Sequence, residues 1–188
     1  MTIFKRLWRI VFSWSFKVPP KEELETADLI LTQAYSRNAD GSSGPGNEIL
    51  ASVVRDCYIL FGTPVLPQEE VSWCLTESVP QVGVANGSKD GRSTIGHNTY
   101  TVAVMQAEYC RGKGVKTVIV VAHPIHMNRA LWVYERLGLR ALPASMPLDY
   151  GKYQGPNLMH GSARCHWFVF WLREMFVARP LFLLQGKI

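Results

Sequence analysis

The clearest structural signal is TVIVVAHPIHMNRALWVYERLG, which occupies residues 117–138. Its first six residues, 117–122, are uncharged, mostly β-branched and bounded by turn residues, as is typical of a strand buried on both faces. After a loop at 123–129, residues 128–137 have the pattern of a helix that ends at Gly138. A buried strand that leads into a helix is the repeating unit of a parallel sheet covered by helices.

The rest of the chain continues this alternation of strands and helices. The other predicted elements are strands at 27–32, 82–85 and 139–144 and helices at 47–61, 67–75, 97–111 and 160–178. Arg179-Pro180 is expected to end the last helix, because proline has no N–H and clashes with the preceding turn. We therefore predict an α/β fold, a Rossmann-like three-layer sandwich with a mostly parallel sheet.

Length and composition narrow the class of protein. A chain of 188 residues is one domain by default, which we place at 22–188. Apolar residues make up 47% and charged residues 19%, a balance that excludes a mainly disordered chain. No uninterrupted apolar run is long enough for a standard membrane-spanning helix. The four cysteines form no CxxC pair, which argues against a zinc ribbon or a disulfide scaffold.

The positive charge is confined to the N-terminal arm, residues 1–20, and the residue that follows it. The net charge is +5, while residues 22–188 hold as many basic as acidic residues. The bases of the first 21 residues, which include no acid, are Lys5, Arg6, Arg9, Lys17 and Lys21. A neutral domain argues against a nucleic-acid partner. Residues 3–17 have the pattern of a basic amphipathic helix, which suits a membrane surface or packing against the apolar C-terminal segment.

The loop at 123–129 is the first candidate site, because ligands of parallel α/β sheets bind outside the carboxyl ends of the strands. Arg129 and the free N–H groups at a helix start suit a phosphate or carboxylate. His126 has the chemistry of an acid or base near neutral pH. An alternative is that Arg129 pairs with Glu135 or Glu174 and that His126 only caps the helix. A metal pair of His123 and His126 is a weaker hypothesis, and we predict no metal site.

Two further loops offer ligand-binding candidates. Ser93, Thr94 and Asn98 lie where a helix follows a polar loop, and their side chains suit either ligand binding or helix capping. Asn47 and Glu48 follow the glycine-rich stretch at 36–46, where they are predicted to face the crevice. Glu48 equally suits the positive end of the helix dipole. No dinucleotide-binding, Walker A, α/β-hydrolase or HExxH motif occurs.

Four segments in the same order resemble the YdcF/SanA/ElyC-like family. They are residues 27–31, Arg92-Ser93-Thr94, residues 117–144 and Leu172-Arg173-Glu174. The resemblance implies a bacterial source, a Rossmann-like fold and a role in cell-envelope biogenesis, in peptidoglycan or its lipid carrier. It assigns the site to His126, Arg129, Ser93, Thr94 and Arg173. The chain has Gln33-Ala34-Tyr35 where the family has a glycine-rich turn.

Two functions remain open at this point. One is an envelope-linked enzyme that acts on a phosphorylated or nucleotide-like substrate, with His126 and Arg129 as catalytic residues. The other is a non-catalytic ligand-binding or adaptor module, for example one that binds S-adenosylmethionine. The predicted location is cytoplasmic or peripheral at the inner membrane, and the sequence does not determine which side of the membrane the protein faces. The cofactor is unknown.

The predicted arm gives a direct test of membrane binding. The complete chain is expected to co-sediment with anionic liposomes, because the arm joins an apolar face to a basic one. A chain that lacks residues 1–20 is expected to stay in the supernatant. Equal pelleting of the two chains contradicts the membrane hypothesis.

Overall fold

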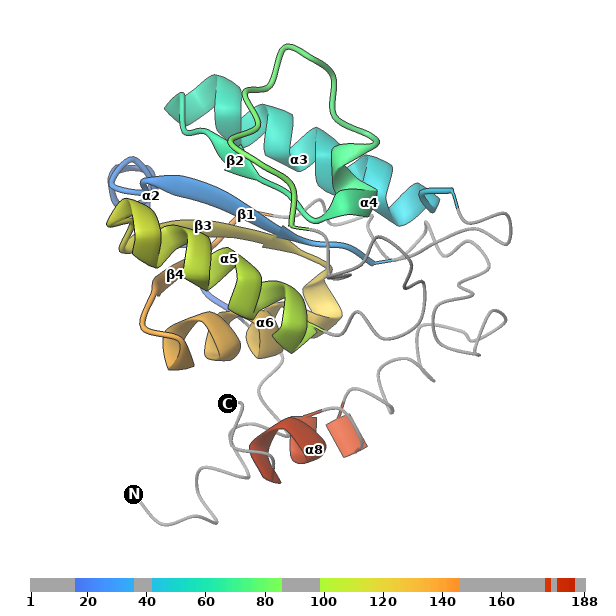
Figure 1. The fold of residues 1–188 in the computed structure, drawn as a ribbon, viewed down its shortest axis with the longest axis vertical. Helices are drawn as coiled ribbons and strands as arrows, with labels where there is room; N and C mark the ends of the chain where they lie inside the picture. Colours follow the sequence, from blue (N-terminus) through green and yellow to red (C-terminus); the bar gives the residue numbers. More distant parts are fainter. Residues whose placement is uncertain (1–15, 36–41, 86–98, 146–174, 177–178, 185–188) are drawn as a thin grey trace.

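The computed structural model describes residues 16–35, 42–85, 99–145, 175–176 and 179–184 (Figure 1). The predicted arm helix at 3–17 therefore lies almost wholly outside the described residues, as does most of the predicted helix at 160–178. None of the helices in the described ranges is long and apolar enough to cross a membrane.

The sheet has four strands, all parallel, in the order β2-β1-β3-β4. The strands are β1 (Leu29–Gln33), β2 (Val65–Leu66), β3 (Thr117–Ala122) and β4 (Arg140–Pro143). Their burial is nearly complete, since helices cover both faces, and this explains their continuous apolar runs. The predicted α/β, Rossmann-like three-layer fold is confirmed, and β3 has the predicted bounds.

Helices form the two outer layers (Figure 1). One face of the sheet packs against α3 and α4, and the other packs against α5 and α6. Each layer contributes small or branched side chains that fill the space above the strands, so the sheet separates two hydrophobic cores. The helices are α2 (Lys21–Leu24), α3 (Pro45–Phe61), α4 (Glu69–Ser72), α5 (Thr99–Lys113), α6 (Pro124–Arg136) and α8 (Arg179–Leu184).

The strand predicted at 82–85 is wrong. Within that segment Ala85 forms an isolated bridge with Gln68, and the preceding Gln81 forms another with Val65. The strand at the outer edge of the sheet, on the side of β1 away from β3, is β2, which has two residues. Pro64 and Pro67 bracket it, and because proline cannot donate to a ladder they confine it to this length.

The start of one helix differs from the prediction in a way that matters for the candidate site, and proline is involved. α6 begins at Pro124, directly after β3, so that His126 lies in a helix and not in a loop. Pro180 lies in the first turn of α8, and the predicted end of the helix at 160–178 lies outside the described residues. Proline is favoured at such a start because the first N–H groups of a helix have no intrahelical partner.

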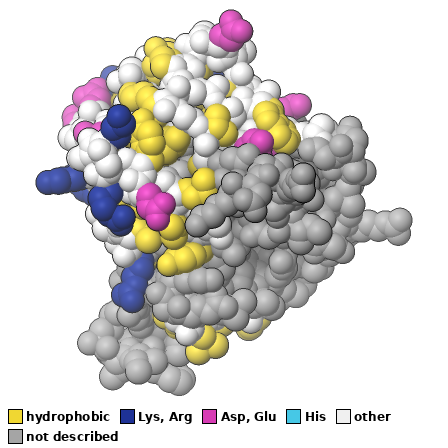
Figure 2. Space-filling view, viewed as in Figure 1, with side chains coloured by type: hydrophobic (Ala, Val, Ile, Leu, Met, Phe, Trp, Pro, Cys, Tyr) yellow, Lys and Arg dark blue, Asp and Glu magenta, His cyan; other side chains and the backbone are white. Residues whose placement is uncertain are grey.

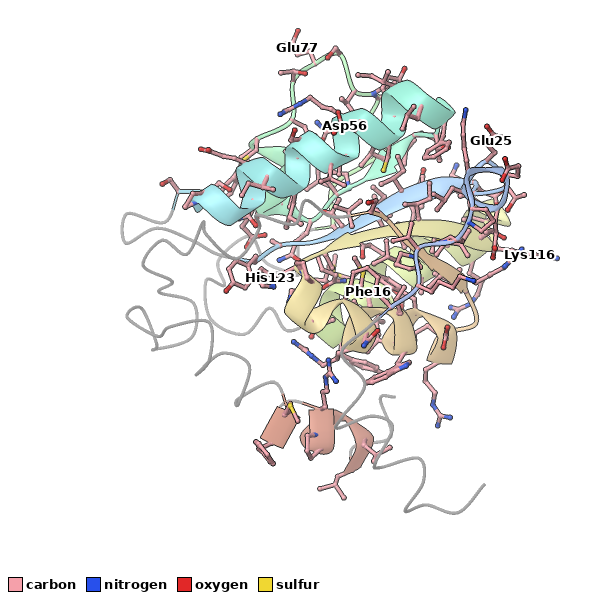
Figure 3. All side chains as sticks on the ribbon, turned by 180° about the vertical axis from the view of Figure 1, so that it is seen from behind. Phe16, Glu25, Asp56, Glu77, Lys116 and His123 are labelled. Carbon is pink, nitrogen blue, oxygen red and sulfur yellow. The ribbon has the colours of Figure 1, made fainter. Side chains whose placement is uncertain are left out.

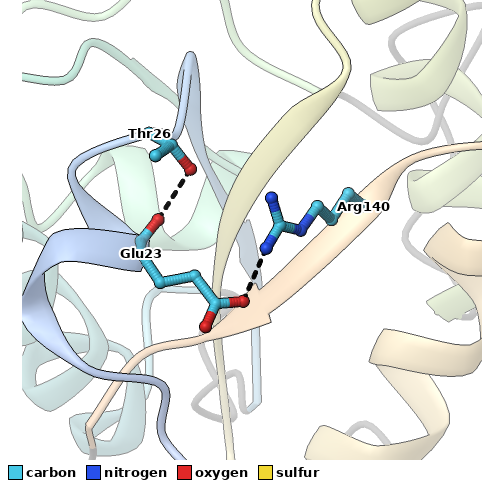
Figure 4. A network of polar contacts seen from close by, with 3 residues as sticks. All are labelled: Glu23, Thr26 and Arg140. Atoms are coloured by element: carbon cyan, nitrogen blue, oxygen red, sulfur yellow. Dashed lines mark hydrogen bonds and ion pairs between the residues drawn. The ribbon is translucent and has the colours of Figure 1, made fainter.

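The amino ends of the strands are tied together by polar contacts. Oδ2 of Asp28 accepts hydrogen bonds from the backbone N–H groups of Lys116 and Thr117, both at 3.1 Å. Arg140 at the start of β4 pairs with Glu23 of α2 at 2.7 Å (Figure 4). In Figure 2, described Lys and Arg side chains gather near this edge with Asp and Glu among them, so no patch of one sign is visible there.

A buried polar network joins the sheet to α5 and α6. The Gln106 amide donates to the carbonyl oxygens of Thr32 at 3.1 Å and Leu66 at 2.9 Å. The Tyr134 hydroxyl donates to Oε1 of Gln106 and accepts from Nε2 of Gln33 at 2.6 Å. These side chains are essentially inaccessible to solvent, so each bond replaces one that water would otherwise supply.

Removing the centre of this network is expected to destabilise the fold. Gln106→Leu leaves two carbonyls and the Tyr134 hydroxyl without their partner, and the free energy of unfolding is expected to fall by roughly 2–4 kcal/mol. Urea unfolding followed by circular dichroism measures the change. Glu108→Gln, an exposed position on the same helix, is expected to stay within about 0.5 kcal/mol of the wild type. A loss below about 1 kcal/mol in Gln106→Leu contradicts this account.

Candidate functional site

The strand order places one position of special interest between β1 and β3. The chain passes from β1 to β2 on one side and from β3 to β4 on the other. Such a reversal separates the loops that follow the two strands and creates the usual ligand position of open parallel sheets, at the carboxyl ends. The segment after β1 contains Tyr35, and the residue after β3 is His123.

Three rings meet at this switch point. The rings of Tyr35 and His123 are stacked, with centroids 3.9 Å apart and planes inclined by 19°. The His126 ring lies 6.1 Å from that of His123 and 6.5 Å from that of Tyr35. Figure 3 shows His123 at the carboxyl end of the sheet, with Lys116 at the opposite end. We call Tyr35, His123 and His126 the ring cluster.

Side-chain amides from two other elements hold the segment that carries Tyr35. The backbone N–H of Ala34 donates to Oε1 of Gln68 at 2.8 Å, and that of Tyr35 donates to Oδ1 of Asn47 at 2.7 Å. The Asn47 amide nitrogen donates to Oγ of Ser43 at 3.1 Å. Asn47 was predicted to bind ligand, and the structure places it, fully buried, as a support for Tyr35.

His126 and Arg129 lie three residues apart in the first half of α6. Both are buried, with 4% of His126 and 9% of Arg129 exposed. Nη1 of Arg129 donates to Oγ1 of Thr99, the first residue of α5, at 2.8 Å. Arg129 therefore links α6 to the N-terminus of α5, and the N-terminal ends of both helices lie at the carboxyl edge of the sheet (Figure 1).

Of the remaining predicted site residues, Glu48 is described by the structure, and it does not join this cluster. Glu48 is exposed and lines a cavity between α3 and α4 on the other face of the sheet. The other candidates, which lie outside the described residues, are Ser93, Thr94, Asn98 and Arg173.

Burial sets the protonation of one member of the ring cluster, His123. It lowers the pKa of His123 to about 3, so this imidazole is neutral at pH 7. A neutral imidazole offers one N–H donor and one nitrogen acceptor. Burial also raises the pKa values of Cys57 and Cys110 to about 11, which keeps both as thiols. Among the described residues no group of three His, Cys, Asp or Glu side chains is arranged to hold a metal ion.

A comparison with family models, curated proteins and solved structures finds no significant match to this chain. The class of protein established by its structure is therefore an α/β domain with a parallel sheet and a ring cluster at its switch point. Any narrower function is an inference from the side chains at that point.

The low pKa of His123 predicts a loss of stability in acid. Below pH 6.5 the unfolded chain takes up a proton at this position that the folded chain refuses until about pH 3. Between pH 6.5 and pH 5 this difference lowers the free energy of unfolding by about 2 kcal/mol. His123→Phe keeps a ring on Tyr35 but cannot titrate, so urea unfolding is expected to show a smaller loss over this range. Equal losses contradict the prediction.

Proposed function

We propose that this protein binds a small phosphate-bearing or nucleotide-like ligand at the carboxyl edge of its sheet, between β1 and β3. The observation that carries the proposal is the position of the ring cluster. Three aromatic or imidazole side chains lie at the switch point, and Arg129 lies on α6, the helix that carries His126. Open parallel sheets bind their ligands at such points.

The chemistry of these groups favours an anion. The N-terminal ends of α5 and α6 carry partial positive charge and N–H groups that are not used within the helix. The Arg129 guanidinium adds a full charge and a planar set of donors that suits phosphate. His126 would exchange a proton with the ligand, and neutral His123 would accept or donate one hydrogen bond.

Burial limits what reaches these groups. Because less than a tenth of either His126 or Arg129 is exposed, only a compact group such as one phosphate would approach them. The larger part of a nucleotide-like ligand would lie outside, against the segments that follow β1 and β3. Binding to the folded chain would therefore raise the melting temperature.

The proposed biological setting is cell-envelope biogenesis, which is what the resemblance to the YdcF/SanA/ElyC-like family implies. The basic amphipathic pattern of residues 3–17 supports contact of the N-terminal arm with an anionic membrane surface. The same resemblance supports the alternative of a non-catalytic module that binds a nucleotide-like molecule such as S-adenosylmethionine. The two alternatives share the binding position and differ only in the role of His126.

Thermal unfolding in the presence of phosphate-bearing compounds tests the binding position. A ligand at a hundredfold excess over its Kd stabilises the fold by about 2.7 kcal/mol, which raises Tm by roughly 5–10 °C for a chain of this length. A panel of phosphodiesters, pyrophosphates and nucleotides is expected to contain at least one such compound. The shift is expected to disappear in Arg129→Ala and to persist in Arg111→Ala, an exposed position on α5.

The shift on adding ligand is the quantity to compare, because Arg129→Ala also loses the bond to Thr99 and is expected to melt earlier. Absence of a shift with every phosphate compound contradicts the proposal. With a ligand in hand, His126→Ala separates the two alternatives: lost turnover with retained binding indicates an enzyme, and binding without turnover in the wild type indicates a module.

A further inference from the structure

A cavity of about 820 Å³ lies between α3 and the end of α4, on the face of the sheet opposite to α5 and α6. Its volume falls within the range of roughly 300–1,000 Å³ that is usual for small-molecule sites. Hydroxyl, charged, indole and thiol groups line it, from Ser42, Ser43, Glu48, Arg55, Trp73 and Cys74. None of these residues belongs to the ring cluster.

Hydrogen bonds between its walls define the cavity. Nη1 of Arg55 donates to the Cys74 carbonyl at 3.2 Å, which joins the middle of α3 to the end of α4. The Cys74 thiol donates to Oγ of Ser43 at 3.2 Å, and that hydroxyl donates to the Glu70 carbonyl at 2.7 Å. The start of α3, its middle and the end of α4 are therefore held at fixed separations.

The two charges of the cavity lie at a defined spacing on one helix. Glu48 and Arg55 are seven residues apart on α3, which is two helical turns, so they share a face at a separation of about 10 Å along the axis. Within the described ranges neither side chain has an ion-pair partner. A guanidinium has five N–H donors, and the contact with the Cys74 carbonyl occupies one of those of Arg55.

This spacing suits a ligand that carries both charges. A ligand with a cationic group at one end and an anionic group at the other places an opposite charge beside each of Glu48 and Arg55. An extended peptide advances about 3.3–3.6 Å per residue, so three residues span about 10 Å. The indole of Trp73, which is 49% exposed, offers a flat apolar surface for a side chain between the two ends.

We propose that the cavity between α3 and α4 binds a short peptide with free ends, its amino group at Glu48, its carboxylate at Arg55 and an apolar or aromatic side chain on Trp73. This site is separate from the anion site proposed at the switch point. It is lined by side chains of α3 and of the segments beside α3 and α4 rather than by the ring cluster, and it needs a cationic as well as an anionic group on the ligand.

Isothermal titration of the complete chain with the tripeptide Gly-Phe-Gly tests this site. The peptide with both ends free is expected to bind best. Its N-acetylated and C-amidated forms are each expected to bind about threefold to fivefold more weakly, as is usual for loss of one partly exposed ion pair. The pair of capped peptides thus reports on each end separately.

Variants assign each end to its partner. In Glu48→Gln, acetylation is expected to have no further effect, and in Arg55→Gln the same holds for amidation. Asp56→Asn removes a charge from the neighbouring exposed position of α3 (Figure 3). Asp56 does not line the cavity, so this variant is expected to bind all three peptides as the wild type does. Glu48 is exposed, so Glu48→Gln is expected to fold normally even if Arg55→Gln does not.

Three results overturn the proposal: no binding at millimolar peptide, equal affinity for free and capped peptides, or equal sensitivity to capping in Glu48→Gln and the wild type. Inorganic phosphate that displaces the peptide and loses affinity in Arg55→Gln also overturns it, because it would identify a simple anion site. Phosphate binding that depends on Arg129 would report on the site at the switch point and not on this cavity. The experiments can therefore show that one proposal fails while the other holds.

Discussion

The parallel pairing of β1 with β3 is the constraint on which the rest of the structure depends. Its register sets Gln33 opposite Ala122, so both strands end at the same level. Because the chain leaves them towards opposite sides of the sheet, the segments after them are brought together at the carboxyl edge, and Tyr35 stacks on His123. A slip of one residue would turn every strand side chain to the other face and destroy both cores and this contact.

The buried polar network serves the same edge. Gln33 is the last residue of β1, and its bond to Tyr134 ties the end of that strand to α6, while Gln106 ties α5 to β1 and β2. Apolar packing alone would allow these helices to slide, since the hydrophobic effect has no direction. Directional bonds fix their positions, and with them the approach of Arg129 to Thr99.

Sequence patterns predicted the features that burial and charge determine locally. A strand covered on both faces needs a continuous apolar run, so β3 was recognisable, and so was the alternation of strands and helices. β2 has only two residues, so it leaves no periodicity to detect. Proline is compatible with the first turn of a helix as well as with a loop, which is why the start of α6 at Pro124 was not predicted. Tyr35 was noticed only as a departure from a glycine-rich turn, because its contact with His123 spans 88 residues of chain.

The first turn of α3 shows why neighbouring residues need not share a function. Asn47 and Glu48 were predicted as members of one site, but successive helical positions differ by about 100°. Asn47 points inward and holds Tyr35 through one end of its amide and Ser43 through the other, whereas Glu48 points outward into the cavity beside α4. A single helix start therefore supports two polar regions, and their functions have to be assigned by contacts in space rather than by adjacency in sequence.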